Sequence, residues 1–142
     1  MTFLLDTNVA VAIIRNNPKI VRDRLKAELE AGASVAISTI AVYELWYGAA
    51  KSARPDENAR LLDAFLSGEV VVLPFDAEAA AIAGQIRAKL KLLGTQIGPY
   101  DLLIAGQALA ANATLVTANK SEFSRVDGLT WEDWSIIGED WP

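Results

Sequence analysis

The sequence contains neither cysteine nor histidine. Without these residues, thiol nucleophiles, Ser-His-Asp triads and histidine acid–base pairs are all excluded. Zinc sites normally draw on cysteine or histidine, so a structural zinc site is excluded as well. Any catalysis would therefore depend on carboxylates, lysine, tyrosine or hydroxyl groups, and an oxygen-only ligand set suits hard cations such as Mg²⁺ and Mn²⁺.

No apolar run in the chain approaches the roughly 20 residues that a helix needs to cross a bilayer. The first six residues, Met1 to Asp6, have no basic start and already contain an acid, so we expect no secretory signal. The lack of cysteine removes any disulfide framework. The lack of cysteine neither requires nor excludes an oxidising compartment, so the simplest expectation, from the lack of a spanning run and of a signal, is a cytoplasmic protein with no membrane partner.

Positive charge is also scarce, since the chain has 13 Lys and Arg residues against 18 Asp and Glu residues and a net charge of −5. This balance is the opposite of the basic footprint of most nucleic-acid-binding proteins and argues against long, non-specific tracking of phosphates. It does not exclude a nuclease, because a bound metal partly neutralises a carboxylate-rich site. The alternative is that the negative charge serves only solubility.

The 142 residues, 52% of them apolar, fit one ordinary domain, which we place at 1–142. Apolar patterning, with glycine and proline as boundaries, predicts strands at 2–5, 35–38, 70–73, 115–117 and 129–136. It predicts helices that begin at Val9 and Pro18 and further helices over about 39–51, 55–68, 77–93 and 99–112. Strands that alternate with helices predict a three-layer α/β/α domain, with a central, mainly parallel sheet of about five strands.

Four polar side chains are placed near the carboxyl ends of predicted strands, where open parallel sheets bind their ligands. Asp6 ends the first strand, and Asn119 follows the fourth strand by two residues. Glu44 lies early in the helix after the second strand, and Asp101 lies in the first turn of the helix that begins near Pro99. Although these four groups are far apart in the sequence, we expect them to meet at one edge of the sheet.

Each of these residues also has a purely structural interpretation. Asp6 begins an Asp-Thr-Asn sequence and would make a good helix N-cap. Asp101 would complement the dipole of its helix, and Asn119 would serve as a further cap. Glu44 and Asp101 are harder to explain in this way, because each is embedded in an apolar stretch where a lone carboxylate is costly unless it is paired or metal-bound.

Four stretches of the chain carry a family resemblance together, although each is a weak motif alone. They are Phe3–Asn8, Ile37–Gly48, Ile97–Ala105 and Leu115–Asn119, followed by Glu122-Phe123, Gly128-Leu129 and Glu132-Asp133-Trp134 near the end of the chain. In this order and spacing the sequence resembles the PIN-domain family, and within it the VapC-like toxins of bacterial toxin–antitoxin pairs. The resemblance covers essentially the whole chain and implies a PIN-like fold.

The resemblance also implies a divalent-metal-dependent endoribonuclease. The catalytic set carried over from the family consists of Asp6, Glu44, Asp101, Asn119 and Thr117, with Ser38 or Thr7 in support. The acids Asp6, Glu44 and Asp101 fall on the positions of the metal ligands. Asn119 falls on a position that is Asp or Asn in the family, and because it carries no charge, the set favours one firmly held Mg²⁺, with Mn²⁺ as a substitute and any second ion held weakly.

In this hypothesis Asp6 and Asp101 bind the metal directly, while Glu44 binds it or orients the attacking water. Asn119 and Thr117 hold waters or ligands through hydrogen bonds. Attack by water leaves a 5′-phosphate and a 3′-hydroxyl. The resemblance further implies an RNA substrate, with initiator tRNA as one candidate, a cognate antitoxin, and a homodimer that enters a higher toxin–antitoxin complex.

Local basic residues would have to hold the RNA. The candidates are Arg15, Lys19, Arg22 and Arg24 on one side of the cleft and Arg87, Lys89, Lys91 and Lys120 elsewhere, with solvated helix faces as the alternative. Tyr100 would be able to stack on a base, although packing against the sheet is the favoured expectation. Trp46 and Tyr47 are interpreted as core residues or as anchors of an interface with the antitoxin or a second subunit.

Two other functions stay open. A phosphatase would use Asp6 as a nucleophile, but Asp6-Thr7-Asn8 lacks the second acid that haloacid-dehalogenase-like phosphatases place two residues later. The chain has no glycine-rich P-loop pattern either. The other alternative is a non-catalytic PIN-like scaffold that only binds partners, and the intact acid set argues against it.

Overall fold

A single parallel sheet forms the centre of the structure, a computed structural model that describes residues 1–136. Residues 137–142 of the domain placed at 1–142 lie outside the described residues. The strands lie in the order β3-β2-β1-β4-β5, and every neighbouring pair is parallel. They are β1 (Thr2–Leu5), β2 (Ser34–Ser38), β3 (Val71–Leu73), β4 (Thr114–Val116) and β5 (Trp131–Glu132). The predicted parallel sheet of about five strands is confirmed.

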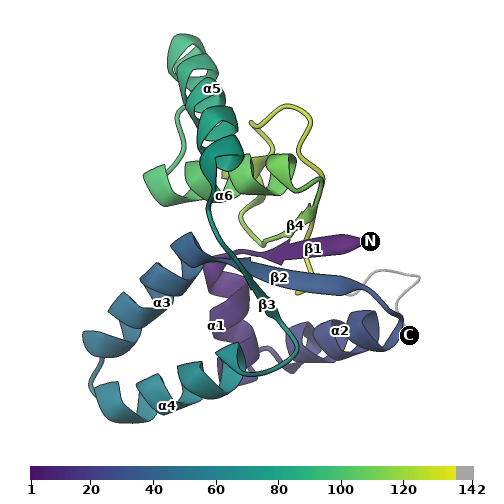
Figure 1. The fold of residues 1–142 in the computed structure, drawn as a ribbon, viewed down its shortest axis with the longest axis vertical. Coiled ribbons are helices and arrows are strands. Elements are labelled where there is room, and N and C mark those ends of the chain that lie inside the picture. Colours follow the sequence, from purple (N-terminus) through teal and green to yellow (C-terminus); the bar gives the residue numbers. More distant parts are fainter. Residues whose placement is uncertain (137–142) are drawn as a thin grey trace.

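Helices cover both faces of this sheet, which makes three layers. They are α1 (Thr7–Arg15), α2 (Lys19–Glu30), α3 (Thr39–Ala50), α4 (Pro55–Leu66), α5 (Ala77–Leu93), α6 (Pro99–Ala110) and α7 (Lys120–Phe123). Figure 1 shows α1 and α2 on one side of the sheet and α5 and α6 on the other, while the packed pair α3 and α4 extends to one side. Within residues 1–136, no helix is long and apolar enough to cross a membrane.

The central strand β1 explains why the strands appear in the sequence as continuous apolar runs. Its residues Phe3, Leu4 and Leu5 are all buried, since helices cover both faces of the sheet. Phe3 packs edge-on against the buried ring of Trp134, with the ring centroids 5.2 Å apart. The residues just after β5 therefore close the core over the first strand.

The predicted strand at 129–136 was too long, because only Trp131–Glu132 pairs with β4. Immediately afterwards the Asp133 carboxylate accepts hydrogen bonds from the backbone N–H and the hydroxyl of Ser135. This local turn directs Trp134 into the core and ends the strand. The short helix α7 was not predicted, and Thr117 lies one residue beyond β4 rather than inside it.

A very close approach of α5 and α6 fixes the position of α6, whose first turn carries Asp101. A Cβ placed on Gly106 would lie only 2.7 Å from the Cβ of Ala83, so no larger residue fits between the two helices here. Glycine at this one position of α6 is therefore required by packing and not by backbone conformation.

We expect Gly106→Ala to lower the free energy of unfolding by about 1–3 kcal/mol, because the added methyl group must force the two helices apart. Urea denaturation measures this change. The matched control is Gly84→Ala in α5, where a new Cβ would meet nothing within 4 Å and the helix propensity of alanine should raise stability by up to about 1 kcal/mol. Equal stability of Gly106→Ala and the unsubstituted protein would contradict this account of the packing.

Candidate active site

Asp6 lies where β1 ends and α1 begins, and its side chain is only 5% exposed. Its Oδ1 accepts a hydrogen bond from the backbone N–H of Val9 at 2.8 Å, which caps α1 as its structural interpretation predicted. Its Oδ2 accepts a second hydrogen bond from the hydroxyl of Thr117 at 2.5 Å. Asp6 therefore caps a helix and also faces the end of the neighbouring strand.

Thr117 is completely buried just beyond β4 and connects two parts of the site. While its hydroxyl donates to Asp6, the same oxygen accepts a hydrogen bond from the backbone N–H of Asn119 at 2.9 Å. Because β1 and β4 are neighbours in the sheet, these contacts form between residues 111 positions apart. The structure thus brings Thr117 beside Asp6 at the carboxyl ends of β1 and β4, an edge of the sheet that we call the acid corner.

Glu44 reaches the same corner from α3 and is half-buried. Its Oε1 accepts a hydrogen bond from the hydroxyl of Thr7 at 2.7 Å, which attaches α3 to the first turn of α1. Thr7 therefore supports the acid set as expected. Ser38 does so only indirectly, since its hydroxyl accepts from the backbone N–H of Ile40 and caps α3.

Asp101 lies in the first turn of α6 and forms a carboxyl–carboxylate pair with Glu122 of α7. Burial, the hydrogen bond to Glu122 and the charges of Glu122, Asp6 and Glu44 raise the pKa of Asp101 to about 7. The same hydrogen bond is the largest cause of a lowered pKa at Glu122. Asp101 is therefore the partner that holds the shared proton.

Glu122 is the acid of this corner that the sequence analysis did not include in the site. Its Oε2 accepts a hydrogen bond from the side-chain amide of Asn119 at 3.0 Å, and its Oε1 accepts from the backbone N–H of Gly98 at 3.3 Å. Asn119 thus holds Glu122, and its side chain makes no helix-capping hydrogen bond. The available signal was the Asn-x-x-Glu spacing at the start of α7.

Electrostatic repulsion links the acids across the corner. Burial is the main cause of a raised pKa at Asp6; the hydrogen bonds from Thr117 and Val9 oppose it, and the charges of Glu44 and Asp133 add to it. The charges of Asp6 and Glu44 in turn act on Asp101. The three acids named from the sequence therefore do meet at one edge of the sheet, together with Glu122.

The donor chemistry of this corner fits a hard divalent cation, because carboxylates and hydroxyls supply only oxygen ligands. The backbone of Gly98 packs closely against the acid pair, since a Cβ there would lie 3.5 Å from Oδ2 of Asp101 and 3.8 Å from Oε2 of Glu122. Across residues 1–136, however, no three acidic side chains are grouped tightly enough to hold a metal ion as they stand. The fit is therefore one of ligand type.

A groove of about 250 Å³ leads away from Thr7 and Glu44 between α1, α3 and α4. Of the basic residues named from the sequence, Arg15 lines this groove, and Lys51, which was not named, lines it as well. Arg24 is instead bonded to Glu28 and Glu132, and Lys89 forms an ion pair with Asp127. The structure therefore brings one of the predicted basic residues into the groove and engages two others in ion pairs elsewhere.

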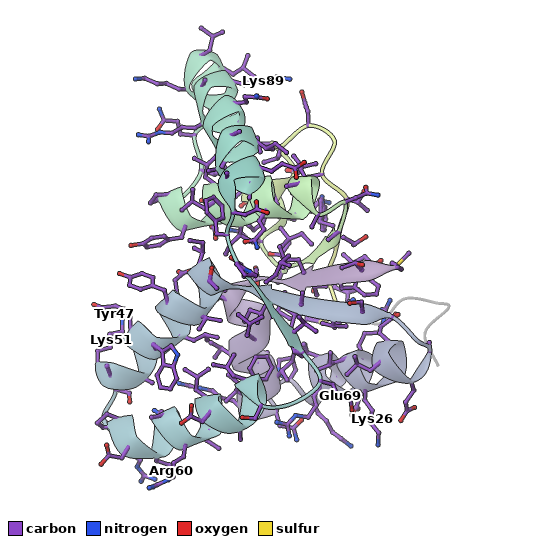
Figure 2. All side chains as sticks on the ribbon, viewed as in Figure 1. Lys26, Tyr47, Lys51, Arg60, Glu69 and Lys89 are labelled. Atoms are coloured by element: carbon purple, nitrogen blue, oxygen red, sulfur yellow. The ribbon has the colours of Figure 1, made fainter. Side chains whose placement is uncertain are left out.

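The exposure of the aromatic residues on α3 and α6 decides between their expected roles, and for Trp46 and Tyr47 it leaves only the interface-anchor interpretation. Trp46 is 38% and Tyr47 is 59% exposed, so neither is a core residue, and Figure 2 shows Tyr47 beside Lys51 on the outer part of α3. Tyr100 is 42% exposed and packs against Tyr43, so the expectation that it packs against the sheet was wrong. Of these rings, Tyr43 and Tyr100 are next to the acids, since they directly precede Glu44 and Asp101 in the sequence.

The fold and this corner define a class of protein: an α/β domain with a carboxylate cluster at the carboxyl ends of its parallel strands. The chain belongs to the PIN-domain family, because the family model described as PIN domain matches residues 3–129. The resemblance found in the sequence is thereby confirmed.

Relatives and solved structures match nearly the whole chain. The chain is 44% identical over 135 residues to the tRNA(fMet)-specific endonuclease VapC of Shigella flexneri, a match that covers 95% of this chain and 99% of that protein. It is 40% identical to the Ribonuclease VapC2 of Rickettsia felis, over 94% of this chain and 98% of the relative. The structure of VapBC2 from Rickettsia felis bound to a DNA fragment from its promoter superposes with a TM-score of 0.88, at 39% identity, over 94% of this chain and 99% of that one.

We expect Glu122→Gln to lower the pKa of Asp101 from about 7, because the substitution removes the negative charge and the carboxylate acceptor that favour protonated Asp101. Carboxyl-carbon NMR of the protein titrated between pH 3 and 9 would follow this group directly. Glu57→Gln, which removes an exposed acid of α4, is the control and should leave the titration unchanged. An unchanged Asp101 titration in Glu122→Gln would contradict the pairing.

Proposed function

We propose that this protein is a metal-dependent endoribonuclease and the toxin of a toxin–antitoxin pair. The observation that carries the proposal is the meeting of Asp6, Glu44 and Asp101 at one corner, where each acid is positioned by a partner from another element. The proposed reaction is hydrolysis of an RNA phosphodiester bond by water, which leaves a 5′-phosphate and a 3′-hydroxyl.

Asp6 and Asp101 would hold the metal directly, and Glu44 would hold it or orient the water. Mg²⁺, for which Mn²⁺ would substitute, would supply a Lewis acid that neutralises phosphate charge and lowers the pKa of water. The partly protonated Asp101 must lose its proton to become a full ligand, and its pKa of about 7 makes that loss accessible at neutral pH. The hydrogen bond to Asp101 lowers the pKa of Glu122, so Glu122 would stay ionised and the proton of Asp101 would pass to solvent.

The residues behind the acids determine how precisely the acids are held. Thr117 directs one oxygen of Asp6, Thr7 directs Glu44, and Asn119 directs Glu122. Hydrogen bonds of this kind typically change metal affinity or activity by about 10- to 100-fold when they are removed. Thr117 and Asn119 are therefore proposed as residues that position the acids rather than as ligands.

The substrate and partner are proposed from the relatives. The Shigella relative is named a tRNA(fMet)-specific endonuclease, and the matching solved structures are VapBC complexes. We infer an initiator tRNA substrate, a cognate antitoxin and a homodimer within the toxin–antitoxin complex, all in the cytoplasm. The groove that starts at Thr7 and Glu44 has a mainly apolar lining that also includes Arg15 and Lys51. Such a lining suits a segment of the antitoxin that binds next to the acids.

The sequence disfavours a phosphatase that uses Asp6 as its nucleophile. Asp6-Thr7-Asn8 lacks the second acid that such phosphatases place two residues later, and the carboxylate of Asp6 is engaged in capping α1 and in the hydrogen bond from Thr117. The remaining alternative, a scaffold that binds without cleaving, is separated by the experiment that follows.

We expect the purified protein to cleave initiator tRNA with Mg²⁺ and to lose this activity in EDTA. Asp6→Asn and Asp101→Asn should each lower kcat by about 100-fold or more, because the loss of a ligand charge weakens both metal binding and charge neutralisation. Sequencing of the RNA ends reports the cleaved bond. Asp23→Asn, at an exposed acid of α2, is the control and should be fully active.

Ends that carry a 2′,3′-cyclic phosphate would refute the water mechanism. The same variants test the toxin in cells, since expression of the unsubstituted protein should arrest bacterial growth and Asp6→Ala or Asp101→Ala should relieve the arrest. Growth arrest that persists in both variants would favour a binding scaffold over an enzyme.

Thr117→Val should lower kcat/KM by about 10- to 100-fold, because valine fills the same volume but cannot donate to Asp6. Thr117→Ser keeps the hydroxyl and should retain most of the activity. Thermal unfolding of both variants is measured alongside, since the buried carboxylate also loses a hydrogen bond in the valine variant. Full activity of Thr117→Val would show that this hydrogen bond does not position the site.

A further inference from the structure

Two exposed tyrosines form a pair at the rim of the acid corner. Tyr43 of α3 is 55% exposed and Tyr100 of α6 is 42% exposed, yet their ring centroids lie only 5.7 Å apart in a tilted arrangement. The pairing rests on this ring contact between α3 and α6. The pair joins helices whose contributing residues are 57 positions apart in the sequence, and it remains open to solvent.

Each tyrosine of the pair is adjacent in the sequence to one of the acids. Tyr43 precedes Glu44 and Tyr100 precedes Asp101 in the sequence. The charge of Glu44 also acts on the Tyr100 hydroxyl. A flat ligand group lying on the pair would therefore be next to whatever the acids hold.

The exposed aromatic surface continues along α3 away from the pair. Tyr47 follows Tyr43 by one helical turn, and the Lys51 ammonium group lies 4.8 Å from the Tyr47 ring centroid. Figure 2 shows Tyr47 and Lys51 together on the outer part of α3. We call Tyr100, Tyr43 and Tyr47 the tyrosine strip; it has a cation at its outer end.

Stacking suits this protein better than charge as a way to hold a polyanion. The net charge is −5, and several cations are already neutralised, with Arg24 bonded to two glutamates, Lys89 to Asp127 and Arg54 to Glu57. Proteins that bind single-stranded RNA use aromatic rings as platforms for unpaired bases, at about 1–3 kcal/mol per base. A tyrosine strip with one cation beside an acid corner matches that form of recognition.

We propose that the tyrosine strip binds unpaired bases of the RNA substrate, with the Tyr43–Tyr100 pair stacking a base next to the bond that is cleaved. Tyr43 and Tyr100 are in this role positioning residues, which hold the RNA in register with the acids and do not take part in the bond cleavage. The proposal rests on the proposed ribonuclease function and assigns the side chains that hold the RNA beside the acids.

The test uses the full-length protein with an initiator tRNA transcript and Mg²⁺. Steady-state cleavage is measured for Tyr43 and Tyr100 replaced singly by Ala, Leu and Phe. Leucine keeps apolar packing without an aromatic ring, and phenylalanine keeps the ring without the hydroxyl. Leu92→Ala is the matched control, because Leu92 is 86% exposed near the far end of α5. Thermal unfolding and gel filtration are recorded for every variant.

The expected result is a KM raised by roughly 5- to 100-fold in the Ala and Leu variants, with a smaller change in kcat. The Phe variants should stay close to the unsubstituted protein, since a phenyl ring stacks as well as a phenol ring. Leu92→Ala should be unaffected. Thermal unfolding should be similar throughout, because both tyrosines are exposed.

Three results would overturn the proposal. Ala variants with unchanged KM would show that the rings do not touch the RNA, and Phe variants as weak as Ala would show that the hydroxyls matter instead of stacking. Ala variants that change the oligomeric state would make the strip a protein interface. If the unsubstituted protein cleaves no RNA, the proposed function itself fails, which is distinct from an active protein whose tyrosine variants behave normally.

Discussion

The hydrogen bond from the Thr117 hydroxyl to Asp6 connects the ends of β1 and β4 and at the same time orients a carboxylate of the acid corner. A carboxylate that is almost completely buried is tolerated only when its oxygens are paired, and Thr117 and the N–H of Val9 provide both partners. Because Asp6 ends β1 and caps α1 while Thr117 follows β4, one side chain joins two neighbouring strands and a helix. The capping and functional interpretations of Asp6 are therefore not alternatives, since capping is what orients the carboxylate.

Near this hydrogen bond the carboxylates of Asp6, Glu44 and Glu122 repel the ionised form of Asp101, which destabilises the fold. The raised pKa of Asp101 means that the folded state binds its proton more tightly than the unfolded state does. Between the ordinary value of 3.8 and about 7, a rise in pH therefore removes stability through this group, and above that range the whole penalty applies. A cation held by the same carboxylates would reverse that effect, because it favours the ionised form. Stability and ligand binding are coupled at the corner for this reason.

The sequence predicts most of the fold because the parallel strands are buried on both faces and therefore appear as apolar runs. The family resemblance, and not the strand pattern, assigned Thr117 to the site, and the structure explains why it lies beside Asp6, since β1 and β4 are neighbours in the sheet. The sequence misses Glu122, because a four-residue helix such as α7 has no detectable periodicity. It also misplaces Tyr100, because the apolar pattern of α6 does not reveal that its first turn lies beside Tyr43 of α3. Contacts between helices, such as the one of Tyr100 with Tyr43 and the one of Gly106 with Ala83, depend on tertiary packing and not on local pattern.

The acids and the tyrosine strip divide the work of recognition in a way that follows from the charge of the chain. Binding that depends on many phosphate contacts weakens steeply as salt increases, whereas stacking depends mainly on the exposed faces of the bases. A chain with a net charge of −5 gains little from the first mode over its whole surface. In the proposed arrangement, the cation held by the acids neutralises the phosphate at the cleaved bond. The tyrosine strip binds the neighbouring bases by stacking. Only an unpaired segment presents base faces and a bare phosphate at the same place, so this division itself would select single-stranded regions of a folded RNA.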